Sequence, residues 1–396
     1  MSIIRVGIKL QNVVPPREAL ADAFLRVMLI DELCDMVLDC CTPQTLVMLA
    51  QTCSDWNSRV CEYMRYRYKI NHSLSHFFAD PMAFRRIQYD TSSLISGMFA
   101  LSFIGRYNWT VNQLDVYVPR YRVHPVVRFL LNSAYRYVPR AQQNSILRYE
   151  LAGPTQTVRF QDGVRPLFCS GQHDRGVHAV YTFQKTLVTH DKETVLTIHI
   201  VESVDAPMHP ILNLDSTVGM NIISYERAYS LYPRATFEEK KGLFLPNPGH
   251  RDIDGVREFT SYRWTLFNIV NTEVYPLFKT RSRWIDDGYS LKISLHRSRD
   301  ERMTFTYSRP NAATHCTLAD PARVTNFRLR YSVIGKAHHC FSAISSSALQ
   351  NYYILHEDRL INALKLLYRH VLRDNYFNSR NEYGSNISYM NTAAFQ

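Results

Sequence analysis

The chain has 396 residues, of which 46% are hydrophobic and 20% are charged. This is the balance of a globular protein with a sizeable core, and the length predicts two or three domains of about 100–200 residues each. Lysine and arginine number 46 against 35 aspartate and glutamate residues, a net charge of +11. That charge permits a polyanionic partner such as a nucleic acid, a nucleotide or an acidic protein surface, but a generically basic protein has the same balance.

Three features concern the compartment of the protein. The first ten residues contain no apolar signal region. The longest uncharged stretch, 91–105, is too short and too rich in serine and glycine to span a bilayer, which needs about 20 apolar residues. The eight cysteines include no C-x-x-C pair, which is typical of reduced core thiols. We therefore expect a cytoplasmic or nuclear protein that is not secreted and has no membrane partner.

Two amphipathic helices are predicted near the N-terminus. Over 29–41, apolar residues recur at spacings of three and four and form one helical face: Leu29, Leu33, Met36, Val37 and Cys40. Thr42 and Pro43 then have the residue types of an N-cap and a first-turn proline. The second helix is expected to bury Leu46, Leu49, Ala50, Cys53, Trp56 and Val60. A module this small cannot bury all its apolar side chains alone, so they must contact the rest of the chain or a partner.

The sequence IDELCDMVLDCCTPQTLVMLAQTCSDWNSRV resembles an F-box. The matching positions are Glu32, Leu33, Val37, Leu38, Leu46, Leu49, Cys53 and Trp56. Ile30 stands where the family pattern has proline, and the match covers 28–65. The resemblance implies that this module binds the Skp-type adaptor of a cullin ubiquitin ligase, through Leu33, Val37, Leu46, Leu49 and Trp56. A plain helical subdomain is the alternative.

Residues 91–118 carry the next pattern, which predicts a helix, a Ser96-Gly97 turn, a second helix and a strand over 113–118. Pro81 begins a short helix before it. In the strand, apolar residues alternate with Gln113 and Asp115, as a half-buried strand requires. A second strand is predicted over 195–201, with Thr197 and His199 on one face.

The remaining elements are predicted to be a helix over 128–135, a strand-turn-helix unit over 212–233, strands between 263 and 308, and an amphipathic helix over 360–371. The Asn/Ser/Tyr-rich tail from residue 378 is expected to be disordered. The fold class predicted is α+β. Its domains are the helical module at 28–65, a mixed sheet flanked by helices at 77–245, a mixed α and β region at 246–377, and the tail at 378–396.

Residues 77–236, within the predicted domain at 77–245, resemble a group of fungal, basidiomycete-type proteins with a nucleotidyltransferase-like core. The segments that carry the resemblance are FFADPMAFRRIQ, TSSLISGMFAL, QLDVYV, TIHIV and STVGMNIISYERAYSLYPRATFEEKKGL. In that superfamily a Gly-Ser turn precedes Asp-x-Asp on the next strand, and a third acid lies on a neighbouring strand. Gly97 matches the turn and Asp115 the second acid. Met98, Gln113 and His199 occupy the positions of the serine and the other two acids.

The resemblance implies that Asp115 is the catalytic and metal-binding residue. It implies a nucleotide- or anion-binding set of Ser96, Gly97, Gln113, Arg106 and His199. Nucleotidyl transfer at two metal ions needs several carboxylates, and Gln is a weak ligand for Mg²⁺. We therefore expect a pseudoenzyme that binds a ligand without turning it over. Mg²⁺ and a nucleotide are cofactors only if the site is functional.

Two alternatives remain open at this point, and a third arrangement of residues is weaker. A divergent nucleotidyltransferase would pair Asp115 with a further acid such as Asp162, Glu202 or Asp205. A basic nucleic-acid binder would use the arginines near the predicted site, which are Arg106, Arg120, Arg122, Arg128, Arg136 and Arg140. Ser96, His199 and Asp115 also have the residue types of a hydrolytic triad, although no G-x-S-x-G elbow accompanies them.

Overall fold

The computed structural model describes residues 26, 28, 30–120, 122–141, 143–152, 176–189, 192–245, 259–295, 320, 322–332, 335–346 and 351–367. The chain divides into two compact units, Met1–Tyr63 and Met64–Gln396. The coarse fold class predicted from the sequence is confirmed, because the described residues combine helices with a mixed sheet. Within the described residues, no helix is both long enough and apolar enough to cross a membrane.

The first unit contains α2 (Asp31–Cys40), α3 (Pro43–Ala50) and most of α4 (Ser54–Arg67). Thr42 caps α3 as predicted, because its side-chain oxygen accepts a hydrogen bond from the Thr45 amide at 3.1 Å. The core of the unit consists of Met28, Cys34, Leu38, Leu46, Val60 and Tyr63.

The helix expected to continue from Thr42 to Val60 is interrupted, which corrects the prediction. The Thr52 hydroxyl donates to the Leu49 carbonyl at 2.7 Å and ends the second helix. A third helix begins at Ser54, with Asp55 in its first turn. Cys53 lies in the break and is exposed, not buried as expected.

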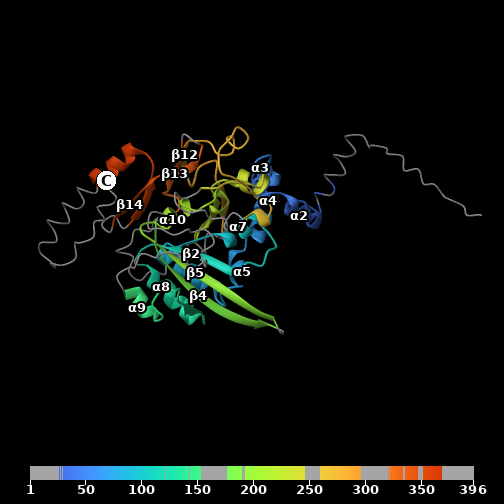
Figure 1. Cartoon of the computed structure of the whole chain (residues 1–396). Helices are drawn as coiled ribbons and strands as arrows, with labels where there is room; N and C mark the ends of the chain where they lie inside the picture. The colour runs from blue at the N-terminus through green and yellow to red at the C-terminus, as the bar shows by residue number, and fades with distance from the viewer. Residues whose placement is uncertain are drawn as a thin grey trace, which may run out of the picture. The chain divides into compact units, whose positions relative to one another are not determined.

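The second unit is built on an eight-stranded sheet in the order β11-β7-β6-β1-β2-β5-β4-β3 (Figure 1). Its strands are β1 (Leu94–Ser96), β2 (Gln113–Val118), β3 (Arg136–Val138), β4 (Val177–Thr189), β5 (Lys192–Ser203), β6 (Asn221–Ile223), β7 (Arg227–Ser230) and β11 (Leu291–Ser294). β2 and β5 are parallel, and every other neighbouring pair is antiparallel. β4 and β5 run side by side beyond the end of the shorter β2.

Helices pack against this sheet and against one another. They are α5 (Ile70–Leu74), α6 (Pro81–Thr91), α7 (Met98–Gly105), α8 (Val123–Asn132), α9 (Leu147–Ala152) and α10 (Met208–Leu212). α7 is buried over 98–104. Phe78, which precedes α6, stacks on Phe84 of α6 at 4.5 Å between ring centroids and meets Phe129 of α8 edge-on at 5.3 Å. These rings join the two helices in one aromatic core.

Smaller sheets complete the second unit. They are β10 (Ser282–Trp284), β12 (Asn326–Tyr331) and β13 (Ala337–Cys340) in one sheet, β14 (Ser342–Ser346) with β15 (Asn351–Leu355), and β8 (Lys241–Leu243) with β9 (Thr265–Phe267). Two short helical segments, η2 (Thr217–Gly219) and η3 (Arg234–Glu238), lie between strands, and residues 358–367 are helical. β11, from the expected C-terminal region, pairs with β7 in the main sheet, so the sheet crosses the expected boundary at residue 245.

Several predicted elements have the expected type and others do not. The strands predicted over 113–118 and 195–201 are confirmed as β2 and β5. Residues 94–96, expected to be helical, form the strand β1, and the helix expected before Pro233 is the β6–β7 hairpin. The helix expected over 128–135 begins at Val123 and ends at Asn132. The tail from residue 378, the whole of 296–308 and Val371 lie outside the described residues.

Candidate functional site

Four neighbouring strands bring four polar side chains into one line across the main sheet. Ser96 of β1 is opposite Asp115 of β2, Asp115 is opposite His199 of β5, and His199 is opposite Thr182 of β4. Residues paired in this way point to the same face of a sheet. None of the four is more than 4% exposed. We call these four residues the polar row.

A second line of polar residues lies next to the polar row on the same face. Gln113, Thr197 and Gln184 are each two positions away from a member of the row and are paired with one another across the strands. All three are half-buried. Gln184 Nε2 donates to Thr197 Oγ1 at 3.4 Å. On β2, β5 and β4, this face of the sheet is therefore fully buried at the polar row and partly exposed two residues away.

Asp115 is held by its two neighbours on this face. Gln113 Nε2 donates to Asp115 Oδ1 at 2.9 Å, and His199 Nδ1 donates to the same oxygen at 3.0 Å. A buried carboxylate requires such donors, since an isolated charge is costly to remove from water. Gln113 and His199, at the positions where the resemblance predicts acids, therefore act as hydrogen-bond donors to Asp115.

Two polar atoms of the row have no partner. His199 Nε2 and Thr182 Oγ1 are buried and make no hydrogen bond among the described residues. They belong to directly opposed residues of β5 and β4. Unpartnered buried polar atoms are rare in folded proteins because each one loses its hydration without compensation.

Ser96 and Gly97 have structural roles at this edge of the row. The Ser96 hydroxyl donates to the carbonyl of Asn221, the first residue of β6, at 2.7 Å, so it is committed to the backbone. Gly97 has φ 81° and ψ −155° at the start of α7, a conformation that favours glycine. Of the triad types, only the Asp115–His199 pair is joined, because the serine hydroxyl bonds elsewhere.

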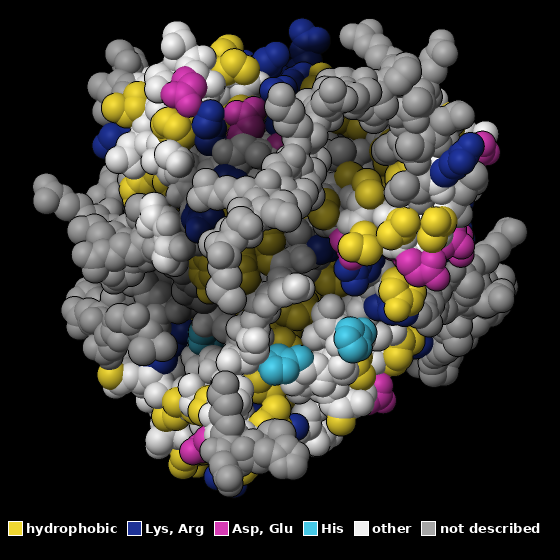
Figure 2. Space-filling view, turned by 90° about the vertical axis from the view of Figure 1, so that its right-hand side faces the viewer, with side chains coloured by type: hydrophobic (Ala, Val, Ile, Leu, Met, Phe, Trp, Pro, Cys, Tyr) yellow, Lys and Arg dark blue, Asp and Glu magenta, His cyan; other side chains and the backbone are white. Residues whose placement is uncertain are grey.

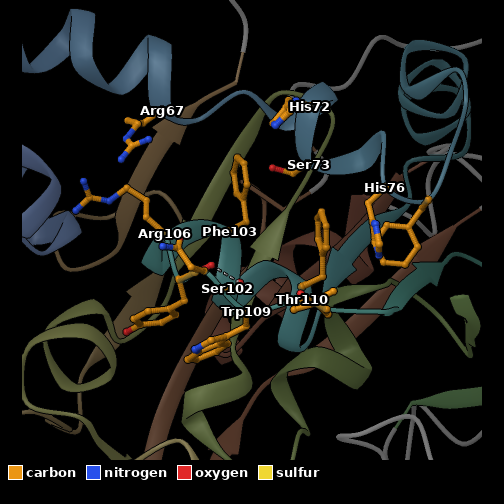
Figure 3. A pocket seen from close by; sticks show the side chains of 14 residues that line it. Arg67, His72, Ser73, His76, Ser102, Phe103, Arg106, Trp109 and Thr110 are labelled. Carbon is orange, nitrogen blue, oxygen red and sulfur yellow. Dashed lines mark hydrogen bonds between the residues drawn. The ribbon is translucent and has the colours of Figure 1, made fainter. Parts of the chain in front are cut away.

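Arg106, which the sequence analysis groups with Ser96, Gly97, Gln113 and His199, does not lie in the polar row. It is the C-cap of α7, at the opposite end from Gly97. An eight-residue helix is about 12 Å long. Gly97 and Arg106 are therefore at opposite ends of α7, and their backbones are too far apart to bind the same small anion together. Arg106 instead lines a cavity of about 420 Å³ together with Arg67, His72 and His76 (Figure 3).

The residues around Asp115 do not fit Mg²⁺, which prefers several oxygen ligands. Within the described chain, no group of three or more His, Cys, Asp or Glu residues is placed to hold a metal ion. Glu202 is three residues along β5 from His199, on the opposite face, where it accepts a hydrogen bond from Tyr181 Oη at 3.2 Å. Asp205 pairs with His209 at 3.3 Å. Asp162 lies outside the described residues.

The predicted partner-binding residues of the first unit differ in exposure. Leu33 and Val37 are 37% and 38% exposed on α2, whereas Leu46 is fully buried and belongs to the core of the unit. Leu49 and Trp56 are half-buried. Three apolar residues outside that set are more exposed: Ile30 at 48%, Met36 at 64% and Met48 at 60%. Ile30 and Met36 are three residues from Leu33, a helical spacing that could have indicated a shared face.

No family model matches this chain, and neither a curated protein nor a solved structure matches it significantly. The functional argument therefore depends on the geometry of the chain itself.

Proposed function

We propose that the chain is a protein-interaction protein of the F-box adaptor type. The first unit binds the Skp-type adaptor of a cullin ubiquitin ligase. The second unit is a catalytically degenerate nucleotidyltransferase-like domain that recognises a ligand or a substrate protein. The observation that carries the proposal is the exposed apolar surface of the first unit.

That surface consists of Ile30, the N-cap of α2, with Leu33, Met36 and Val37 of the same helix, and we call it the apolar stripe. Cys34 and Leu38 of the same helix are buried in the core of the unit. α2 is therefore apolar on two adjacent faces, of which the unit covers one. Contiguous exposed apolar side chains on a small helical unit are typical of a docking surface for another protein.

The polar row supports the non-catalytic part of the proposal. Asp115 is 2% exposed and accepts hydrogen bonds from Gln113 and His199. A metal-dependent transferase would need a second and a third carboxylate to bridge metal ions, and a histidine and a glutamine occupy those positions. The strands that carry a catalytic site in active transferases here stabilise the sheet.

The test measures binding of the full chain to a purified Skp-type adaptor by isothermal titration calorimetry. We expect a dissociation constant in the micromolar range or below. The double variant Leu33→Asp/Val37→Asp should weaken binding by about 30-fold or more, because charged groups in the centre of an interface cost about 2 kcal/mol or more. Both positions are exposed, so the fold should be retained, which circular dichroism would verify.

The matched control is Met82→Asp on α6 of the second unit, where the side chain is 44% exposed. It introduces one carboxylate, of the type that the double variant introduces twice, on an exposed helical side chain, and should leave adaptor binding unchanged. Failure of the unmodified chain to bind the adaptor at micromolar concentration would show that the adaptor function is wrong.

Nucleotidyl transfer at Asp115 is the second candidate, favoured by one observation. The order strand, positive-φ glycine, helix, strand over 94–118 is the order in which such enzymes build their phosphate site. The chain would be incubated with labelled nucleotides, Mg²⁺ or Mn²⁺, and a mixed RNA or protein acceptor pool. Transfer that disappears in Asp115→Asn would replace the pseudoenzyme assignment with an enzymatic one.

A further inference from the structure

The cavity at the C-terminal end of α7 lies within the second unit. Residues from the last turn of α4, from α5 and from the segment 106–111 line it (Figure 3). Its volume of about 420 Å³ is in the range of small-molecule binding sites, about 300–1,000 Å³. Its lining includes none of the four residues of the polar row, so the cavity is a different site.

The apolar wall of the cavity is aromatic and held in place by further rings. Phe99 and Phe103 come from α7, and each meets another ring edge-on: Phe99 meets Phe77 at 5.7 Å, and Phe103 meets Tyr68 at 5.6 Å between centroids. The Tyr68 hydroxyl donates to the Ile104 carbonyl at 3.0 Å, which fixes its ring. A wall restrained in this way loses little side-chain freedom when a ligand binds.

The side of the cavity formed by Trp109 is also restrained. The Trp109 ring stacks on the Tyr107 ring, with 4.3 Å between their centroids. It also packs against the tilted ring of Tyr262, again with 4.3 Å between centroids. The Ser102 hydroxyl donates to the Tyr107 carbonyl at 3.2 Å, which ties this segment to α7 (Figure 3). The cavity is therefore shaped before a ligand arrives.

The charge of the lining has one sign. Arg67, Arg106, His72 and His76 line the cavity, and the described residues of its lining include no aspartate or glutamate. Figure 3 shows Arg67 and Arg106 on one side of it and His76 on the other. Arginine recognises phosphate with two parallel hydrogen bonds, and the hydroxyls of Ser73 and Thr110 add neutral polar groups to the same lining.

We propose that this cavity binds a ring-bearing phosphate of the size of a nucleoside monophosphate. The ring lies against Phe99 and Phe103, and the phosphate is held by Arg67 and Arg106. The inference rests on the part of the proposed function that makes the second unit a ligand-binding domain. It places the anion site at the C-terminal end of α7 and not at the Gly97 turn.

The experiment is calorimetric titration of the full chain with a 5′-mononucleotide, the matching nucleoside and inorganic phosphate. We expect the mononucleotide to bind at least about tenfold more tightly than either fragment, because only it engages both walls. Arg67→Gln and Arg106→Gln should each weaken binding about tenfold or more, the loss expected for a charge-assisted hydrogen bond. Arg148→Gln, an exposed arginine of α9 outside the cavity, is the matched control and should bind as the unmodified chain does.

Three results would overturn the inference. The first is that no mononucleotide binds, and the second is that inorganic phosphate binds as tightly as the mononucleotide. The third is that mononucleotide affinity survives both arginine substitutions but is lost in Gln113→Ala, which would indicate binding at the polar row instead. None of them bears on adaptor binding, which depends on the apolar stripe. The failure of one proposal is thus distinguishable from the failure of the other.

Discussion

At the scale of single residues, Asp320 is a carboxyl group with no exposed surface. Burial raises its pKa to about 6, although the hydroxyls of Ser224 at 2.5 Å and Tyr229 at 2.8 Å donate to it and act in the opposite direction. The unfolded carboxyl has a pKa of about 3.9. The folded state therefore holds this proton more tightly between about pH 4 and pH 6.

This difference predicts a loss of stability as pH rises through that window. The Asp320 contribution falls by up to about 3 kcal/mol between pH 4 and pH 6, and is constant above it. In Asp320→Asn this group no longer titrates, so the variant does not lose this contribution. As pH rises from 4 to 6, the free energy of unfolding of the unmodified chain should therefore fall relative to that of the variant. Denaturant unfolding at several pH values measures this difference. A difference that does not change with pH would contradict the prediction.

A second residue-scale prediction concerns the Asp115–His199 pair. Removing the imidazole in His199→Ala leaves the buried carboxylate with Gln113 as its remaining donor among the described residues. We expect a loss of about 2–4 kcal/mol in the free energy of unfolding, because a buried charge loses its partner. The control is His338→Ala on β13, where the side chain is exposed and the change should be near zero. A loss no larger than in this control would show that the pair does not stabilise the sheet.

At the scale of elements, alternation identifies some strands and misses others. β2 and β5 alternate apolar and polar residues, so their sequences predict them as strands, whereas the pairing of Asp115 with His199 comes from the assembled sheet. β1 has only three residues, all buried, and therefore has no alternation to detect. The bond from Ser96 to the Asn221 carbonyl joins residues 125 positions apart. Such partners follow from the assembled sheet, which local patterns do not encode.

The link between β10 and the end of β7 gives the element-scale prediction. Arg283 of β10 is 6% exposed, binds Asp287 through two nitrogens at 2.8 and 3.0 Å, and donates to the Leu231 carbonyl at 2.7 Å. Burial opposes ionisation of Asp287, but the hydrogen bonds from Arg283 outweigh it and keep the pKa of that carboxyl below its usual range. Lysine cannot reproduce this planar geometry.

Arg283→Lys should therefore lower the free energy of unfolding by about 2–4 kcal/mol, measured by denaturant unfolding. The control is Arg281→Lys, two residues earlier. Arg281 lies over the ring of Tyr289 and forms no ion pair with a carboxylate among the described residues, so this substitution should change stability by less than about 1 kcal/mol. Equal effects of the two substitutions would contradict a special role for the Arg283–Asp287 pair.

At the scale of the whole molecule, the net charge of +11 raises the question of nucleic-acid binding. Among the described residues visible in Figure 2, lysine and arginine side chains are interspersed with acidic and hydrophobic ones. A protein that neutralises several phosphates of a polymer loses affinity steeply with salt, with a slope of log K against log salt of about −0.9 per phosphate for duplex DNA. A mononucleotide in the α7 cavity presents one phosphate.

The two modes of binding therefore separate in a salt titration. We expect mononucleotide affinity to change by less than about tenfold between 50 and 200 mM salt, since few counterions are released. Binding to a mixed-sequence oligonucleotide should be weak and become undetectable over the same range. Arg106→Gln should reduce mononucleotide binding and leave the oligonucleotide slope unchanged, because the cavity is one local site and the polymer contacts the dispersed charge. Oligonucleotide affinity that stays high at 200 mM salt would instead favour a dedicated nucleic-acid surface on this chain.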